Sequence, residues 1–183
     1  RGDLGVELPF EQVPIAQKRI IQLANLHGRP VITATQMLES MIEYPRPTRA
    51  EASDVANALF DGTDAVMLSA ESASGKFPVQ AVKSMVRIIT SIEQGSEIMF
   101  NKFGENNDDS VTLINDKLVR AAARLSANID AKAILGMTKS GYTGFRLSSH
   151  RPKANIFIFT DDKKILNTMN LVWGIRGFYY EKR

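Results

Sequence analysis

Short apolar runs alternate with amphipathic stretches along the first half of the chain, and this rhythm restricts the fold more than any other feature. The apolar runs at residues 30–34 and 64–68 have the length of buried strands. Apolar residues at helical spacing occupy residues 11–27, the stretch 48–61, and the stretch that begins at Pro78. Alternation of strands with helices is typical of a parallel α/β sheet, so we predict an α/β fold.

Two sequence patterns predict where helices begin. Thr48 and Glu51 form a capping box, in which each residue satisfies a backbone N–H of the other at the helix start. Thr33 and Gln36 have the same spacing and predict a second helix that runs through Met41.

Glycine and proline mark further boundaries in the same half of the chain. Gly28 and Gly62 predict two helix ends, because glycine adopts the left-handed backbone that commonly follows a last helical turn. Pro78 suits a first helical position, and residues 69–76 before it are predicted to form a polar loop.

The second half of the chain contains a smaller version of the same arrangement. Apolar periodicity predicts a βαβ unit whose elements, in chain order, occupy residues 115–128 (helix), 131–137 (strand), 143–150 (helix), 154–160 (strand), 161–173 (helix) and 175–180 (strand). The most loop-like stretch, residues 101–110, precedes it. We therefore place one domain at residues 1–94 and a second, incomplete domain at residues 95–183.

Composition argues against several classes of protein. No apolar run approaches the roughly 18 residues that span a bilayer, and a net charge of +3 without a basic run argues against nucleic-acid binding. The absence of cysteine excludes disulfides and thiolate chemistry and suits a reducing cytoplasm, while two histidines cannot form a multi-histidine metal site. Residue 1 is not Met and no leader follows it, so we expect a piece of a longer protein.

Four polar segments are candidates for chemistry, because parallel α/β proteins collect function where strands end and loops begin. The first is Arg1-Gly2-Asp3-Leu4-Gly5-Val6-Glu7, in which flanking glycines let an acidic residue approach a metal closely. A single carboxylate supplemented by phosphate oxygens suits Mg²⁺. A polar turn that caps the next helix and an adhesive Arg-Gly-Asp loop are the alternatives.

The second and third candidates follow the two predicted strands. The hydroxyl of Thr35 could bind a substrate or relay a proton, although Thr33 or Thr35 could instead cap a helix. Residues 69–73 could line the same site as Thr35, at the ends of the predicted strands, or form a solvated loop.

The fourth candidate lies between a predicted strand and a predicted helix in the second half. It combines hydroxyls, a cation, a glycine and the free N–H groups of a helix start, and it consists of Thr138, Lys139, Ser140, Gly141, Tyr142 and Thr143. Such a set makes a good phosphate cradle, whereas an ordinary strand–helix turn is an equally simple interpretation.

The chain resembles the pyruvate kinases in three motifs: RGDLGVELPFEQVPIAQKRII, GRPVITATQMLESM and PRPTRAEASDVANALFDGTDAVMLSAESASGKFPVQAV. The likeness is nearly continuous from residue 1 to about residue 90 and continues more loosely through TKSGYTGFRLSSHRP and VWGIRG. It implies the last part of a (β/α)₈ TIM barrel followed by an incomplete C-terminal regulatory α/β domain. It also implies a cytoplasmic glycolytic enzyme, a homotetramer when intact, that converts phosphoenolpyruvate and ADP to pyruvate and ATP with Mg²⁺ (or Mn²⁺) and K⁺.

The resemblance also assigns roles to residues. Asp3 corresponds to a carboxylate ligand of the divalent metal, Gly2 to a backbone contact with the substrate, and Thr35 to a group that helps to protonate the enolate. Residues 138–143 correspond to the loop that binds the phosphate of an allosteric effector. The family's catalytic lysine, its second acidic metal ligand, its phosphate-binding arginine and its K⁺ ligands lie upstream of residue 1, so we expect this chain alone to be inactive.

Four positions depart from the family pattern. Ala70 stands where glycine is more common, Ser72 where threonine is common, and Gly144 where alanine is usual, while Tyr142 lies in the effector loop and leaves the effector's identity open. Two other functions stay open at this stage. One is a different phosphoenolpyruvate or oxo-acid barrel enzyme, such as a lyase or aldolase, and the other is a non-catalytic regulatory fragment that binds a sugar phosphate.

Overall fold

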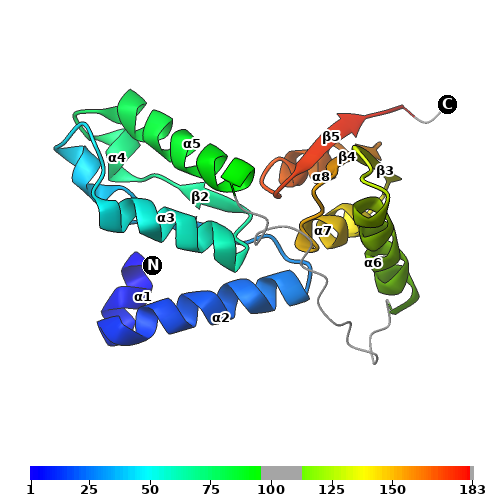
Figure 1. Cartoon of the computed structure of the whole chain (residues 1–183), viewed down its shortest axis with the longest axis horizontal. Coiled ribbons are helices and arrows are strands. Elements are labelled where there is room, and N and C mark those ends of the chain that lie inside the picture. Colours follow the sequence, from blue (N-terminus) through cyan, green and yellow to red (C-terminus); the bar gives the residue numbers. More distant parts are fainter. Residues whose placement is uncertain (96–112, 182–183) are drawn as a thin grey trace. The chain divides into compact units, whose positions relative to one another are not determined.

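The chain divides into two compact units in a computed structural model that describes residues 1–95 and 113–181 (Figure 1). Unit 1 comprises Arg1–Leu23 and Val31–Met99, and unit 2 comprises Ala24–Pro30 and Phe100–Arg183. The predicted loop at residues 101–110 lies outside the described residues, and the domain boundary near residue 95 stays a prediction.

The first half of the chain forms helices around a pair of parallel strands. Its elements are α1 (Gly2–Glu7), a 3₁₀ turn (Phe10–Gln12), α2 (Val13–Leu26), β1 (Ile32–Ala34), a second 3₁₀ turn (Glu39–Ile42), α3 (Arg49–Asp61), β2 (Ala65–Met67), α4 (Ala70–Ala73) and α5 (Pro78–Gly95). Strands β1 and β2 pair in parallel, with Ile32 opposite Ala65 and Ala34 opposite Met67. The parallel pairing confirms the predicted α/β arrangement.

Most of the predicted helix boundaries are confirmed. The hydroxyl of Thr48 accepts a hydrogen bond from the Glu51 N–H at 3.2 Å, and the Glu51 carboxylate accepts one from the Thr48 N–H at 2.7 Å, so α3 begins with a complete capping box. Gly62 ends α3 with a φ of 99°, and Gly28 follows α2 with a φ of 60°. Pro78 is the first residue of α5.

The capping box predicted at Thr33 and Gln36 is wrong. Thr33 lies inside β1, and its hydroxyl donates to the hydroxyl of Thr63 at 3.0 Å. Thr35 and Gln36 both have positive φ values, of 68° and 52°, and this backbone cannot enter a right-handed helix. The next regular element is the 3₁₀ turn at Glu39–Ile42, which has no side-chain cap.

The polar loop predicted at residues 69–76 is correct only in part, because α4 occupies Ala70–Ala73 within it.

The core of unit 1 is built from the helices and from the segment that follows β1. Its buried members are Met37, Leu38, Met41, Val55, Ala58, Leu59, Ala81 and Met85. Burying a large apolar side chain contributes about 1.5–3 kcal/mol to the stability of the fold. The buried side chains of Met37 and Leu38 therefore anchor the segment after β1.

Unit 2 contains a parallel sheet with the strand order β3-β4-β5. Its elements are α6 (Leu113–Asn128), β3 (Ala133–Met137), α7 (Tyr142–Ser149), β4 (Asn155–Thr160), α8 (Lys163–Met169) and β5 (Ile175–Tyr179). Two successive βαβ units make this sheet, as the apolar periodicity predicts. Helix α8 ends at Met169, four residues before the predicted end at residue 173.

The core of unit 2 lies around the central strand β4. Ile156 and Ile158 are fully buried at alternate positions of β4, as expected for one face of a strand, and Met169, Leu147 and Ala123 pack with them. No helix in the described part of the chain is long and apolar enough to cross a membrane.

Candidate functional site

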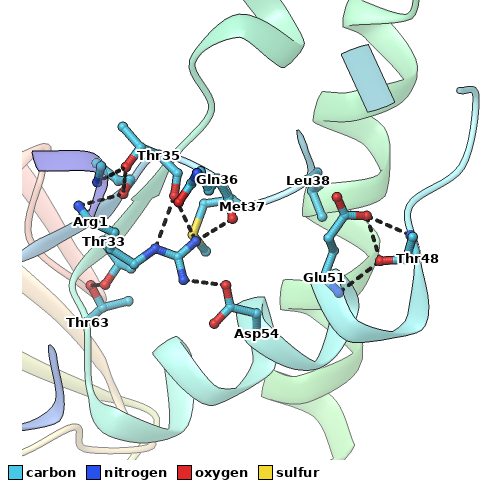
Figure 2. Close-up of polar contacts among 12 residues, drawn as sticks. Arg1, Thr33, Thr35, Gln36, Met37, Leu38, Thr48, Glu51, Asp54 and Thr63 are labelled. Atoms are coloured by element: carbon cyan, nitrogen blue, oxygen red, sulfur yellow. Dashed lines mark hydrogen bonds and ion pairs between the residues drawn. The ribbon is translucent and has the colours of Figure 1, made fainter. Parts of the chain in front are cut away.

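Arg1 organises the segment that follows β1 (Figure 2). Its Nε and Nη2 donate to the carbonyl of Thr35 at 3.1 and 2.7 Å, and Nη2 also donates to the carbonyl of Gln36 at 2.5 Å. Its Nη1 forms an ion pair with Asp54 of α3. One guanidinium group therefore joins the start of the chain, the end of β1 and helix α3, as its fixed fork of donors allows.

The backbone held by Arg1 is strained. Two consecutive left-handed residues, Thr35 and Gln36, are unusual, and a β-branched residue such as threonine is a clear outlier in this region. Each such residue costs about 1–3 kcal/mol and persists only where the surroundings over-determine it. The Arg1 contacts on one side and the fully buried Met37 and Leu38 on the other supply that support.

The Thr35 hydroxyl joins the two segments that carry the candidate residues. It accepts a hydrogen bond from the Gly2 N–H at 2.9 Å and donates one to the Ala34 carbonyl at 2.6 Å. The structure thus brings together Gly2 and Thr35, two residues that the resemblance assigns to the substrate. Neither Thr33 nor Thr35 caps the 3₁₀ turn that follows β1, so both capping alternatives are wrong for that turn. The N–H that bonds to Thr35 instead belongs to the first residue of α1.

Asp3 lies in the first turn of α1, next to Gly2, with an exposed side chain. Its carboxylate has the oxygen donors that Mg²⁺ or Mn²⁺ prefers. Among the described residues, no group of three or more His, Cys, Asp and Glu side chains could hold a metal ion. Asp3 therefore fits as one ligand of a site whose other ligands would come from substrate, water or protein outside this set.

The segment at residues 69–73 contains exposed residues, Ser72 and Ala73, as the solvated-loop alternative expects, and one buried residue, Glu71, that the sequence does not single out. The Glu71 carboxylate is 2% exposed, and it accepts hydrogen bonds from the Leu38 N–H at 3.0 Å and from the Ser69 N–H at 2.7 Å. A buried carboxylate needs such donors. Glu71 thus ties the segment after β1 to the segment after β2, and it neither lines an open mouth nor faces solvent.

Glu51, whose capping bonds with Thr48 are drawn in Figure 2, also forms a second clamp on the segment after β1. Its carboxylate accepts hydrogen bonds from the N–H and the hydroxyl of Ser40, each at 2.6 Å, as well as from Thr48. Burial by itself would raise the pKa of Glu51, but the hydrogen bonds from Ser40 and Thr48 outweigh burial and lower the pKa below its usual value.

The candidate phosphate loop in unit 2 follows β3 directly. The Gly141 N–H donates to the Thr138 hydroxyl at 3.0 Å, which uses one of the N–H groups that the sequence offers to a phosphate. Gly141 has a φ of 81° and precedes the first residue of α7. Lys139 and Ser140 are exposed, so a cation and a hydroxyl at the tip of the loop face solvent.

Tyr142 is tied to helix α6 by residues that the sequence patterns do not single out. Its hydroxyl donates to the carboxylate of Asp116, which is 5% exposed. Arg146 pairs with the same carboxylate, with Nε 2.8 Å from Oδ1, and its guanidinium lies 5.7 Å from the centre of the Tyr142 ring. The side chain at the middle of the candidate loop is therefore held in place by α6 and α7.

Comparison with known protein families assigns both halves of the chain. Residues 1–82 match the family described as pyruvate kinase, barrel domain, and residues 116–183 match pyruvate kinase, alpha/beta domain. The chain belongs to the pyruvate kinase family.

The curated relatives are similar to this chain in sequence and are about three times as long. Pyruvate kinase from Geobacillus stearothermophilus is 50% identical over 175 residues, which cover 96% of this chain and 30% of that protein. Pyruvate kinase from Clostridium acetobutylicum is 44% identical over 183 residues, which cover all of this chain and 38% of that protein. The chain therefore spans about a third of the length of these pyruvate kinases.

A solved structure supports the same assignment for the fold. The crystal structure of a pyruvate kinase from Cryptosporidium parvum superposes with a TM-score of 0.88 at 36% identity, covering 98% of this chain and 36% of that chain. The predicted fold class, the last part of a pyruvate kinase barrel followed by part of its α/β domain, is confirmed. These matches favour pyruvate kinase over the lyase and aldolase alternatives.

Proposed function

We propose that this chain is part of a glycolytic pyruvate kinase that transfers the phosphoryl group of phosphoenolpyruvate to ADP and protonates the resulting enolate to pyruvate. The observation that carries the proposal is the hydrogen bond between the Gly2 N–H and the Thr35 hydroxyl, inside a region that matches the pyruvate kinase barrel. This bond joins the glycine-flanked acidic motif to a threonine on strained backbone at the end of a parallel strand.

The residues take distinct roles in this reaction. Asp3 would provide one oxygen ligand for Mg²⁺ or Mn²⁺, which would neutralise negative charge on the transferring phosphoryl group. Gly2 would contact the substrate through its backbone. Thr35 would hold its hydroxyl near the substrate, where it can help to deliver a proton to the enolate. K⁺ would be held mostly by residues outside this chain.

Arg1 supports the site without serving as its phosphate ligand. Its guanidinium is engaged by the carbonyls of Thr35 and Gln36 and by Asp54. Phosphoryl transfer depends on positive charge directed at the phosphate oxygens, and Arg1 has its donors committed elsewhere. We therefore propose that the required cations come from outside this chain and that the chain alone is inactive.

We further propose that Thr138, Lys139, Ser140, Gly141, Tyr142 and Thr143 bind the phosphate of a regulatory metabolite in a cytoplasmic homotetramer. The exposed Lys139 and Ser140, and the start of α7 behind Gly141, support this proposal. A phosphate at this place would meet a full positive charge, hydroxyl donors and the N–H groups of the first helical turn.

The reaction is tested with a full-length protein that contains this chain, assayed for pyruvate formation from phosphoenolpyruvate and ADP. Asp3→Asn keeps the shape of the side chain and removes its charge, and we expect turnover to fall at least ~10²-fold. Glu7→Gln makes the same charge change at another exposed position of α1 and should leave turnover nearly unchanged. Normal activity of Asp3→Asn at ordinary Mg²⁺ concentrations would remove Asp3 from the metal site.

The regulatory loop is tested by titrating the same enzyme with sugar phosphates and nucleotides. Replacement of both Ser140 and Thr143 by Ala should abolish activation and leave unactivated turnover unchanged, because coupling between distinct sites is a separate free energy. A double variant that responds like the wild type, or an enzyme that no phosphorylated metabolite affects, would reduce residues 138–143 to an ordinary turn.

A further inference from the structure

Several positively charged side chains of unit 1 line a cleft of about 400 Å³ between helix α5 and the loop at residues 45–47. The polar residues that line it are Arg46, Gln80, Lys83, Ser84 and Arg87, and we call this set the basic cleft. It belongs neither to the Arg1–Thr35 cluster nor to the loop after β3.

Helical periodicity explains why these side chains meet. Gln80, Lys83, Ser84 and Arg87 follow one another at intervals of three, one and three residues, so they share one face of α5. Another face of the same helix carries the buried core residues Ala81 and Met85. The core thus fixes the rotation of α5 and directs its polar face into the cleft.

The charge of the basic cleft is unbalanced. Three of its lining residues are cations and none is a carboxylate. Some cations of the same half of the chain have acidic partners, as in the Lys18–Asp61 and Lys76–Glu43 pairs. Within the described residues, neither Arg46, Lys83 nor Arg87 takes part in an ion pair. Like charges four residues apart on a helix disfavour folding, so an anion would complete this arrangement.

The facing wall of the cleft is stiff. Arg46 lies between Pro45 and Pro47, and each proline ring fixes its own backbone φ. A wall with little backbone freedom loses little entropy when a ligand binds, which favours a defined site over a loose surface patch.

We propose that the basic cleft binds a small anion with two phosphate groups, joined directly or through a short carbon skeleton. Guanidinium groups match phosphate oxygens in a bidentate fork, and the cleft has Arg46 from the loop, Arg87 from α5, and Lys83 as a third point charge. Ser84 and Gln80 add hydrogen-bonding groups for ester oxygens or hydroxyls. A volume of about 400 Å³ holds such a ligand and exceeds the needs of one phosphate. This site does not depend on the proposed reaction.

The test is calorimetric titration of the 183-residue chain with inorganic pyrophosphate at low ionic strength. We expect saturable binding of one pyrophosphate at the basic cleft that is tighter than binding of inorganic phosphate and weakens as salt is raised. The double variant Arg46→Gln and Arg87→Gln should weaken it at least ~10-fold, because charge-assisted hydrogen bonds to both walls are lost. Ser84→Ala should weaken it by a smaller factor.

Two controls make the result decisive. Arg19→Gln removes one exposed positive charge from α2 and should leave the affinity within about twofold, since Arg19 does not line the cleft and makes no charge-assisted hydrogen bond to its ligand. Lys139→Gln removes the cation of the loop after β3. Pyrophosphate binding that survives the double variant but is lost in Lys139→Gln would overturn the proposal, and so would a wild-type chain that shows no saturable binding.

Discussion

The two units hold the segment that follows a parallel strand in place by different contacts. Each carries a segment with candidate residues at the carboxyl end of a parallel strand, residues 35–38 after β1 and residues 138–143 after β3. The first segment is held by Arg1, from 34 and 35 residues away along the chain, and includes two strained non-glycine residues. The second is closed by a bond between Thr138 and Gly141, three residues apart, with a glycine at its left-handed position, and it is also tied to a remote residue by the bond from Tyr142 to Asp116.

This difference matches the tasks proposed for the two segments. A group that acts in chemistry must keep its geometry to within a fraction of an ångström, and distant contacts with a buried core provide that rigidity. A regulatory loop must accept a ligand, and a turn with exposed Lys139 and Ser140 leaves donors accessible. The remote contacts of Thr35 and Gln36 suit the proposed reaction site, and the accessible donors of Lys139 and Ser140 suit the proposed binding loop.

The largest effect is expected from Thr35→Ala in a full-length enzyme. Loss of the hydroxyl should lower turnover ~10²-fold, as for other lost acid–base groups, while stability falls by only about 1 kcal/mol for the hydrogen bond from Gly2. Turnover and thermal melting are measured side by side, with Thr35→Ser as the control that keeps a hydroxyl. A variant that melts earlier but turns over normally would give Thr35 a purely structural role.

Arg1→Gln should break the long-range support of unit 1. Two carbonyls and Asp54 would lose a charged partner, and we expect the free energy of unfolding to drop by about 2–3 kcal/mol in denaturant titrations of the 183-residue chain. Arg1→Lys keeps the charge without the fork and should recover part of the loss. The comparison variant is Lys76→Gln, whose exposed pair with Glu43 contributes about 0–1 kcal/mol. Equal losses in the Arg1 and Lys76 variants would contradict the clamp.

A pair of backbone substitutions sharpens the comparison between the two segments. Gly141→Ala should destabilise unit 2 by about 1–2 kcal/mol, because the new Cβ would lie 2.7 Å from the Phe145 ring and alanine is strained at a φ of 81°. Gln36→Gly should change unit 1 by less than about 0.5 kcal/mol, because relief of strain at a φ of 52° offsets the added freedom of the unfolded chain. Thermal unfolding measures both variants, and a large loss in Gln36→Gly would show that the strain there is small.

The smallest effect concerns the second clamp and depends on pH. Because the pKa of Glu51 is lower in the folded chain, Glu51 adds stability above its unfolded pKa of about 4.5 and loses that contribution as pH falls through the folded value. The melting temperatures of the wild type and Glu51→Gln should therefore converge on acidification below about pH 4.5. A difference that stays constant from pH 6 to pH 3 would show that Glu51 acts by shape rather than charge.

Local patterns succeed in this chain where one helix or strand decides the outcome. The capping box at Thr48 and Glu51 is present, and Gly62 ends the helix that the box begins. The same spacing at Thr33 and Gln36 fails, because Thr33 pairs with Thr63 across the sheet. Both sites contain the same pattern, and neighbours distant in sequence select between a helix and a strand.

In the candidate sites, too, local patterns predict some features and miss the contacts between distant residues. The loop at residues 138–143 is recognisable locally, since its glycine, hydroxyls and cation are consecutive. The contact between Gly2 and Thr35 could be expected from strand ends and family motifs. The clamps were missed, because Arg1 and Asp54 are 53 residues apart and Glu71 holds an N–H 33 residues before it. No periodicity or short motif encodes such pairs.

By itself, the sequence determined the alternation of helices and strands, the parallel α/β class and the pyruvate kinase family, because periodicity, capping and continuous motifs are properties of neighbouring residues. Tertiary structure decided that Thr35 and Gln36 take left-handed backbone, that Arg1 holds their carbonyls, and that Glu71 is buried between two loops. The physical reason is that a strained backbone and a buried charge are each unfavourable alone. They become stable only when partners from remote parts of the chain meet them in a packed core.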